Sequence, residues 1–104
     1  MAHSFSYTHY DLGMQRGGAM IEITLSAIAN VRLMSHANFD RFKNTVKHKF
    51  LGGVAKQSPI RLRIPESGHW HVVVDMEGHP GKAESSIKVI PHAPRKPAPR
   101  FGAA

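Results

Sequence analysis

The chain has 104 residues, 41% of them hydrophobic, and a formal net charge of +7 at pH 7. This length suits one domain with a single core, and the hydrophobic content excludes a disordered polyelectrolyte. Because the sequence contains no cysteine, disulfides, thiolate zinc sites and cysteine nucleophiles are excluded.

Targeting and membrane signals are also missing from the sequence. The first twenty residues lack the apolar run of a signal peptide, and no stretch reaches the roughly 18 apolar residues that cross a bilayer. We therefore expect a cytoplasmic protein without a membrane partner.

The first third of the chain predicts short strands, because apolar and polar side chains alternate there. The predicted strands cover residues 4–10, 20–26 and 31–33. The second strand directs Ile21, Ile23 and Leu25 to the core. Residues 11–13 break the first strand, since they include glycine.

One or two helical turns are predicted next, over residues 35–44. Ser35 and Asn38 are both good N-cap residues, and Phe39 and Phe42 share one helical face at i, i+3 spacing. We expect these two phenylalanines to pin the helix to the sheet.

Residues 43–56 then predict an exposed basic loop. Gly52 and Gly53 predict a chain bend within it, with positive φ or a close backbone approach.

A β-hairpin is predicted over residues 59–76. Its first strand alternates isoleucine and leucine with Arg61 and Arg63, and Pro65 to Gly68 supplies the turn. The second strand has a dry face with Trp70, Val72, Val74 and Met76. Its wet face carries His69, His71, Val73 and Asp75.

A closing strand at 83–90 directs Ile87 and Val89 inward, and a proline-rich basic tail follows from Pro91. We expect one domain at 1–90 and a flexible tail at 91–104. Six or seven short strands and one small helix predict an all-β, mainly antiparallel fold, either a small β-sandwich or a partly open barrel.

The eight histidines of the chain are its main candidates for a metal site. His69 and His71 share a strand face and could reach one metal, with Asp75 further along as a carboxylate ligand. A site needs three or four ligands, and the sequence does not place His36, His48 or His79 near them. The alternative is ordinary polar residues on a strand, so we expect no cofactor and treat His69 and His71 as weak metal candidates.

The positive charge raises a second possibility, an anion- or nucleic-acid-binding module whose binding weakens with salt. Three of the cations belong to the tail. The candidate patch on the domain consists of Lys43, Lys47, Lys49, Arg61 and Arg63. A solvated basic surface is the ordinary alternative.

No complete catalytic pattern is present, so we expect the protein not to be an enzyme. Ser67 has no nucleophile-elbow pattern around it, and the glycine pairs lack the lysine and helix of a phosphate loop. Unpaired sheet edges leave a homodimer open.

Several short motifs occur in a specific order. They are Asn38-Phe39 with Phe42, Gly52-Gly53, Ser58-Pro59, Gly68-His69-Trp70 after Pro65, and Ser86 to Ile90 at the end. Together, from Phe5 to Ile90, they resemble the bacterial domain of unknown function 1883 family. The resemblance implies a small antiparallel β-domain from bacteria.

No activity, cofactor or catalytic residue is established for that family. Some of its members look fused to Toll/interleukin-1-receptor-type domains, which implies a binding or sensing module. The leading hypothesis is therefore a non-catalytic module that binds a protein or a small ligand.

Overall fold

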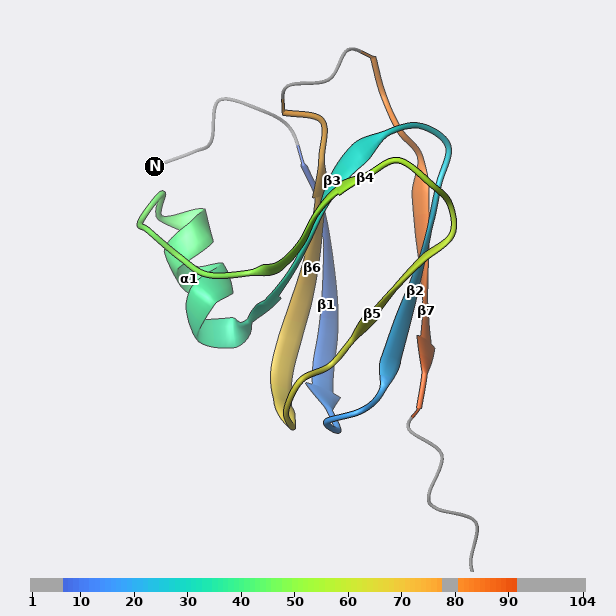
Figure 1. Cartoon of the computed structure of the whole chain (residues 1–104). Helices are drawn as coiled ribbons and strands as arrows, with labels where there is room; N and C mark the ends of the chain where they lie inside the picture. Colours follow the sequence, from blue (N-terminus) through green and yellow to red (C-terminus); the bar gives the residue numbers. More distant parts are fainter. Residues whose placement is uncertain (1–6, 78–80, 92–104) are drawn as a thin grey trace, which may run out of the picture.

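The computed structural model describes residues 7–77 and 81–91, which form two antiparallel sheets packed face to face (Figure 1). The first sheet has the strand order β1-β6-β3-β4 and the second has the order β5-β2-β7. The elements are β1 (Tyr7–Gln15), β2 (Met20–Leu25), β3 (Ala29–Ser35), α1 (His36–Lys43), β4 (Leu51–Ala55), β5 (Ile60–Arg63), β6 (Gly68–Asp75) and β7 (Ser85–Ile90). The predicted all-β sandwich with one short helix is confirmed, and the described strands do not close into a barrel.

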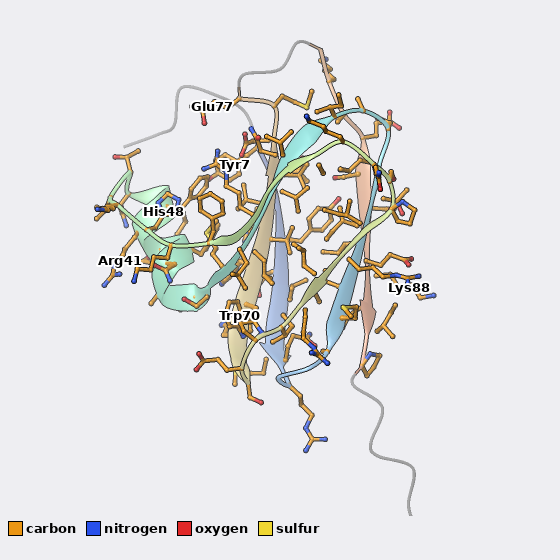
Figure 2. The ribbon with its side chains drawn as sticks, in the orientation of Figure 1. Tyr7, Arg41, His48, Trp70, Glu77 and Lys88 are labelled. Atoms are coloured by element: carbon orange, nitrogen blue, oxygen red, sulfur yellow. The ribbon has the colours of Figure 1, made fainter. Side chains whose placement is uncertain are left out.

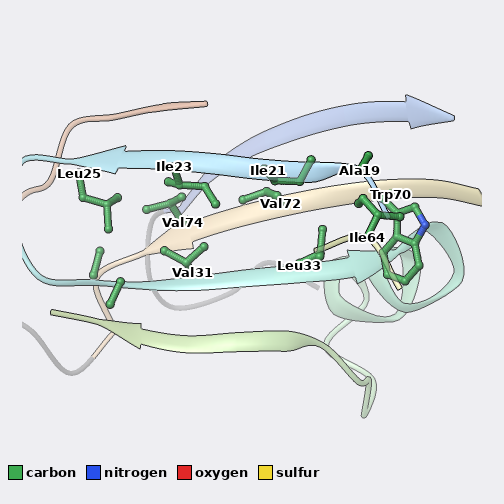
Figure 3. Packing of buried hydrophobic residues seen from close by; sticks show 12 residues of the cluster. Ala19, Ile21, Ile23, Leu25, Val31, Leu33, Ile64, Trp70, Val72 and Val74 are labelled. Carbon is green, nitrogen blue, oxygen red and sulfur yellow. The ribbon is translucent and has the colours of Figure 1, made fainter. Parts of the chain in front are cut away.

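The main core lies between the two sheets and follows the predicted alternation. Ile21, Ile23 and Leu25 of β2 face Val72 and Val74 of β6 across the sandwich (Figure 3). The side chains of Ile21 and Ile23 are fully buried. The inward directions predicted for β2 and for the dry face of β6 are therefore confirmed.

The predicted hairpin at 59–76 is wrong, although both of its strands exist. β5 pairs with β2 in the second sheet, whereas β6 lies between β1 and β3 in the first. The last hydrogen bond of this pairing on the β5 side is donated by the Ile64 N–H to the carbonyl of Ala19 at 2.8 Å. The pairing ends there because Pro65 has no N–H to donate. The chain then crosses to the other sheet. The inward-facing residues of both strands were therefore predicted correctly, but the pairing of β5 with β6 was not.

The predicted basic loop is also shorter than expected, because residues 51–55 form edge strand β4 beside β3. Gly52 has φ +111°, and a Cβ atom there would lie 2.3 Å from the carbonyl oxygen of Val31. The positive φ and the close backbone approach are confirmed, but they occur within a strand and not at a bend.

Helix α1 begins where its cap residue predicts. The Ser35 hydroxyl accepts a hydrogen bond from the Asn38 N–H at 3.3 Å, so Ser35 and not Asn38 is the N-cap. The helix covers the outer face of the first sheet and forms a second, smaller core there. The buried residues of this second core are Met34, Phe39, Phe42 and Val73.

Strand β7 ends at Ile90, and Ile87 and Val89 pack against the main core as predicted. The start of the predicted first strand, residue His79 and nearly all of the predicted tail lie outside the described residues. In the part of the chain that is described, no helix has the length and apolarity required to span a bilayer.

Candidate metal centre

A cluster of aromatic rings lies between α1 and the outer face of the first sheet, with His71 of β6 in the middle. The His71 residue is only 2% exposed, because Phe39 of α1 stacks on its ring at a centroid distance of 4.3 Å. Asp75, further along β6, is buried as well. The prediction of a solvated face for these residues is therefore wrong, since α1 covers His71 (Figure 1) and Arg32 and Asn30 of β3 contact Asp75.

Three imidazoles from three different elements form a hydrogen-bonded row through His71. Its Nδ1 atom lies 2.8 Å from Nε2 of His9 on β1, and its Nε2 atom lies 2.9 Å from Nδ1 of His36 on α1. One nitrogen of each pair carries the proton and the other accepts it. Both ring nitrogens of the buried histidine are thus satisfied, as burial requires.

His69 adds a fourth imidazole to this cluster. Its ring stacks on His36 at 4.4 Å and on His71 at 4.5 Å, and its Nε2 atom lies 2.7 Å from Oδ1 of Asp11. His36, His69 and His71 each offer one ring nitrogen, and these three atoms lie within 4.8 Å of one another. Within residues 7–77 and 81–91, no other group of three potential metal ligands lies so close together.

The surroundings of His9 and His71 favour the neutral form of these two imidazoles. Burial lowers the pKa of His71 to about 4, although the nearby Asp11 charge opposes this effect. Burial also lowers the pKa of His9. The hydrogen bond from His69 lowers the pKa of Asp11 to about 2, and the N–H of Gly13 contributes to the same effect. Near neutral pH, His9 and His71 are therefore neutral, so each ring has one N–H donor and one acceptor nitrogen.

These pKa values predict that acid weakens the metal-free fold. His71 has a lower pKa when folded than when unfolded, so the unfolded chain binds more protons between about pH 6.5 and pH 4. The free energy of unfolding should fall as pH decreases through this window, by at most about 1.4 kcal/mol per pH unit. Urea unfolding in a metal chelator at several pH values measures this slope.

The matched variants for that measurement are His71→Gln and His48→Gln. Removing the titrating group at 71 should flatten the slope, whereas the variant at 48 should keep it, because His48 contacts the rings of Phe42 and Phe50 and the Val46 carbonyl instead of His71. An unchanged slope in His71→Gln would show that another group causes the acid sensitivity.

Other residues considered as metal ligands are engaged elsewhere. The Asp75 carboxylate lies 3.0 Å from Nε of Arg32 and accepts a hydrogen bond from the Asn30 amide at 2.8 Å. His48 lies beside α1 against the ring of Phe42 (Figure 2). Of the three histidines that the sequence could not place, the structure brings His36 into the cluster, leaves His48 outside it and does not describe His79.

Two residues of the cluster, His9 and Asp11, were not predicted. Both lie on β1, and Asp11 was read as part of a strand break. Their only sequence signal is the i, i+2 spacing, which places both on one strand face. Their proximity to β6 depends on a pairing between segments about sixty residues apart, which no local pattern reveals.

The predicted basic patch is divided between two parts of the fold. Lys43 lies in the last turn of α1 and Lys47 and Lys49 in the loop after it, whereas Arg61 and Arg63 lie on β5 in the other sheet. All five side chains belong to exposed residues, and two of them have acidic partners. Those pairs are Lys43 with Asp40 at 3.8 Å and Arg61 with Glu22 at 3.0 Å. The role of this patch in anion binding stays a prediction.

The fold and the cluster together define a small two-sheet β protein with a candidate transition-metal centre beneath its helix. A family model described as a domain of unknown function (DUF1883) matches residues 5–93. The chain therefore belongs to this family, which confirms the resemblance found in its motifs. Comparison with curated proteins and with solved structures found no match.

Proposed function

We propose that the protein is a non-catalytic binding module and that it binds a divalent transition metal through His36, His69 and His71. The observation that carries the proposal is the placement of three imidazole nitrogens within 4.8 Å of one another. Imidazole is a preferred ligand of zinc, copper, nickel and iron, and it binds as the neutral form. The lowered pKa of His71 supplies that form near neutral pH.

Metal binding requires only a small rearrangement of the three imidazoles. In a tetrahedral zinc site with bonds of 2.0–2.1 Å, two ligand nitrogens lie about 3.4 Å apart. His36 and His71 already place their nitrogens 2.9 Å apart. His69 must approach them, and since the rings of His36 and His69 are only 11° from parallel, one must turn before both planes contain the metal.

The burial of the three ligands fits this movement. His71 is held by the stacked ring of Phe39, so it is the fixed ligand. His36 is exposed and the His69 side chain is 33% exposed, so both can rotate toward an incoming ion. Because the ligands come from β6 and α1, a bound metal would also tie the helix to the sheet.

Three protein ligands leave one coordination position for water or for a donor from another molecule. Metal sites of this kind are also used in catalysis, where a nearby base activates the bound water. Asp11, the carboxylate within this cluster, has a pKa of about 2 and is a weak base near neutral pH. Among the described residues, the cluster therefore lacks the nearby strong base that a hydrolytic metal site uses, and this supports a role in binding over one in hydrolysis.

The test uses the untagged protein, because a purification tag would itself bind metal. We expect elemental analysis to find a transition metal in the purified protein, and titration calorimetry of the chelator-treated protein to show one Zn²⁺ ion per chain. His36→Gln and His69→Gln should each weaken Zn²⁺ binding by more than the roughly 10–100-fold that loss of an indirect contact costs. His48→Gln should bind as the unaltered chain does.

Both ligand variants change exposed or half-exposed residues, so they should fold. At a free Zn²⁺ concentration of about 100 times the dissociation constant, the unaltered chain should gain about 2.7 kcal/mol in free energy of unfolding. Absence of metal in the purified protein together with no saturable Zn²⁺, Ni²⁺ or Cu²⁺ uptake would falsify the proposal. The expected bacterial origin, the cytoplasmic location and the possible homodimer stay predictions.

A further inference from the structure

We infer that the bulge in β1 orients the metal ligands, with Asp11 acting as the positioning residue for His69. The inference rests on the proposed metal site and concerns residues that do not themselves contact the ion.

The bulge is a local change of register between β1 and β6. Asp11 is paired with His71 and Gly13 with Trp70, so Leu12 is the extra residue. Gly13 has φ +66°, a left-handed conformation that favours glycine, and its N–H donates to Oδ1 of Asp11 at 2.9 Å. The carboxylate is thereby held by its own strand.

This arrangement directs the carboxylate to one particular histidine. Oδ1 of Asp11 lies 2.7 Å from Nε2 of His69 but 3.9 Å from Nδ1 of His71. A carboxylate can only accept, so Nε2 of His69 must donate and carry the proton. In the neutral ring the lone pair then lies on Nδ1, which becomes the metal ligand, and the carboxylate holds the ring in this orientation.

His9, the second β1 residue of the cluster, can accept a hydrogen bond from His71 as Asp11 does from His69. For Nε2 of His71 to bind a metal beside His36, its Nδ1 atom must carry the proton and donate to Nε2 of His9. β1 thus supplies the indirect contacts, whereas β6 and α1 supply the ligands. Asp11 and Gly13, which belong to the predicted strand break, therefore form part of this support, together with His9 of the predicted strand.

The experiment compares Asp11→Ala and Asp11→Asn with a matched control, Asp40→Asn. Asp40 is an exposed carboxylate on α1 outside the cluster, so its variant reproduces the change in net charge. We expect Asp11→Ala to weaken Zn²⁺ binding about 10–100-fold and Asp11→Asn to weaken it less, because the amide oxygen can still accept from His69. Asp40→Asn should change it less than twofold.

A second readout needs no metal. Long-range ¹H–¹⁵N NMR of the chelator-treated protein reports which ring nitrogen of His69 carries the proton. We expect the Nε2–H tautomer in the unaltered chain and in Asp40→Asn, and a mixture in Asp11→Ala. This readout separates an orienting role from a general effect on folding.

The outcomes distinguish the two proposals. If the unaltered chain binds Zn²⁺ and Asp11→Ala binds it equally well, the metal site stands and the role of Asp11 is refuted. An Nδ1–H tautomer in the unaltered chain also refutes that role, whatever the metal result. If the unaltered chain binds no metal, the proposed function fails and the inference fails with it.

Discussion

Replacing Trp70 by alanine should lower the free energy of unfolding by about 3–5 kcal/mol. Trp70 is the single tryptophan of the chain and lies between the two sheets at one end of the core, 8% exposed (Figure 3). Its indole N–H donates to the carbonyl of Glu66 at 2.9 Å, so truncation removes both apolar contact and a hydrogen bond of the loop between β5 and β6. For a domain this small, such a loss approaches the whole stability.

Urea unfolding followed by far-ultraviolet circular dichroism measures this loss, since the variant has no tryptophan fluorescence. Trp70→Phe is the matched variant, because it keeps an aromatic ring in the core and removes only the N–H donor and part of the volume. It should lose clearly less stability than Trp70→Ala. Equal losses would indicate that the hydrogen bond to Glu66, and not packing, determines the contribution of this residue.

The second large effect is expected for Gly52→Ala in edge strand β4. A Cβ atom at this position would lie 2.3 Å from the Val31 carbonyl oxygen, far inside van der Waals contact, and the φ of +111° already disfavours alanine. Both β3 and β4 would have to separate where they pair. We expect a loss of at least about 3 kcal/mol, above the roughly 1–3 kcal/mol of backbone strain alone.

Gly53→Ala provides the control next to it. Gly53 also has a positive φ, +149°, but no described heavy atom outside Gly53 and its two chain neighbours lies within 4 Å of the position of its Cβ. The difference between the two variants therefore measures the contact with Val31 separately from backbone strain. If both variants lose the same free energy, the close approach of β3 and β4 is relieved by a small shift and has no energetic importance.

Alternation predicted most strands of this fold because it reports which face of a strand is dry. It predicted the core positions of β2, β6 and β7 for this reason. It did not reveal that β5 and β6 belong to different sheets, because a hairpin and a crossing between two packed sheets both direct apolar residues to the same core. Turn residues such as Pro65 occur in both arrangements.

The wet face of β6 was predicted wrongly for a related reason. A sheet face with His71 and Asp75 looks solvated from the sequence, and only tertiary structure shows that α1 covers His71 and that side chains of β3 enclose Asp75. The two phenylalanines of α1 were correctly expected to pack on the sheet. What the sequence could not give was the position of that contact, directly over the histidines of β6.

The candidate site was predictable only in part. His69 and His71 were paired by their i, i+2 spacing, which is a property of any strand. His36 and His9 join them through packing of α1 and pairing of β1, both of which depend on residues distant in sequence. Asp11 was missed because a bulge and a strand break share the same glycine signal.

The central position of β6 has a consequence for the rate at which a metal could leave. β6 pairs with a strand on each side, so its amides should exchange with solvent only when the whole domain unfolds. His36, in contrast, is the first residue of an eight-residue helix whose end can fray. Dissociation of a bound ion should therefore follow local opening of α1, and hydrogen exchange of the helix should slow on metal binding while that of β6 stays unchanged.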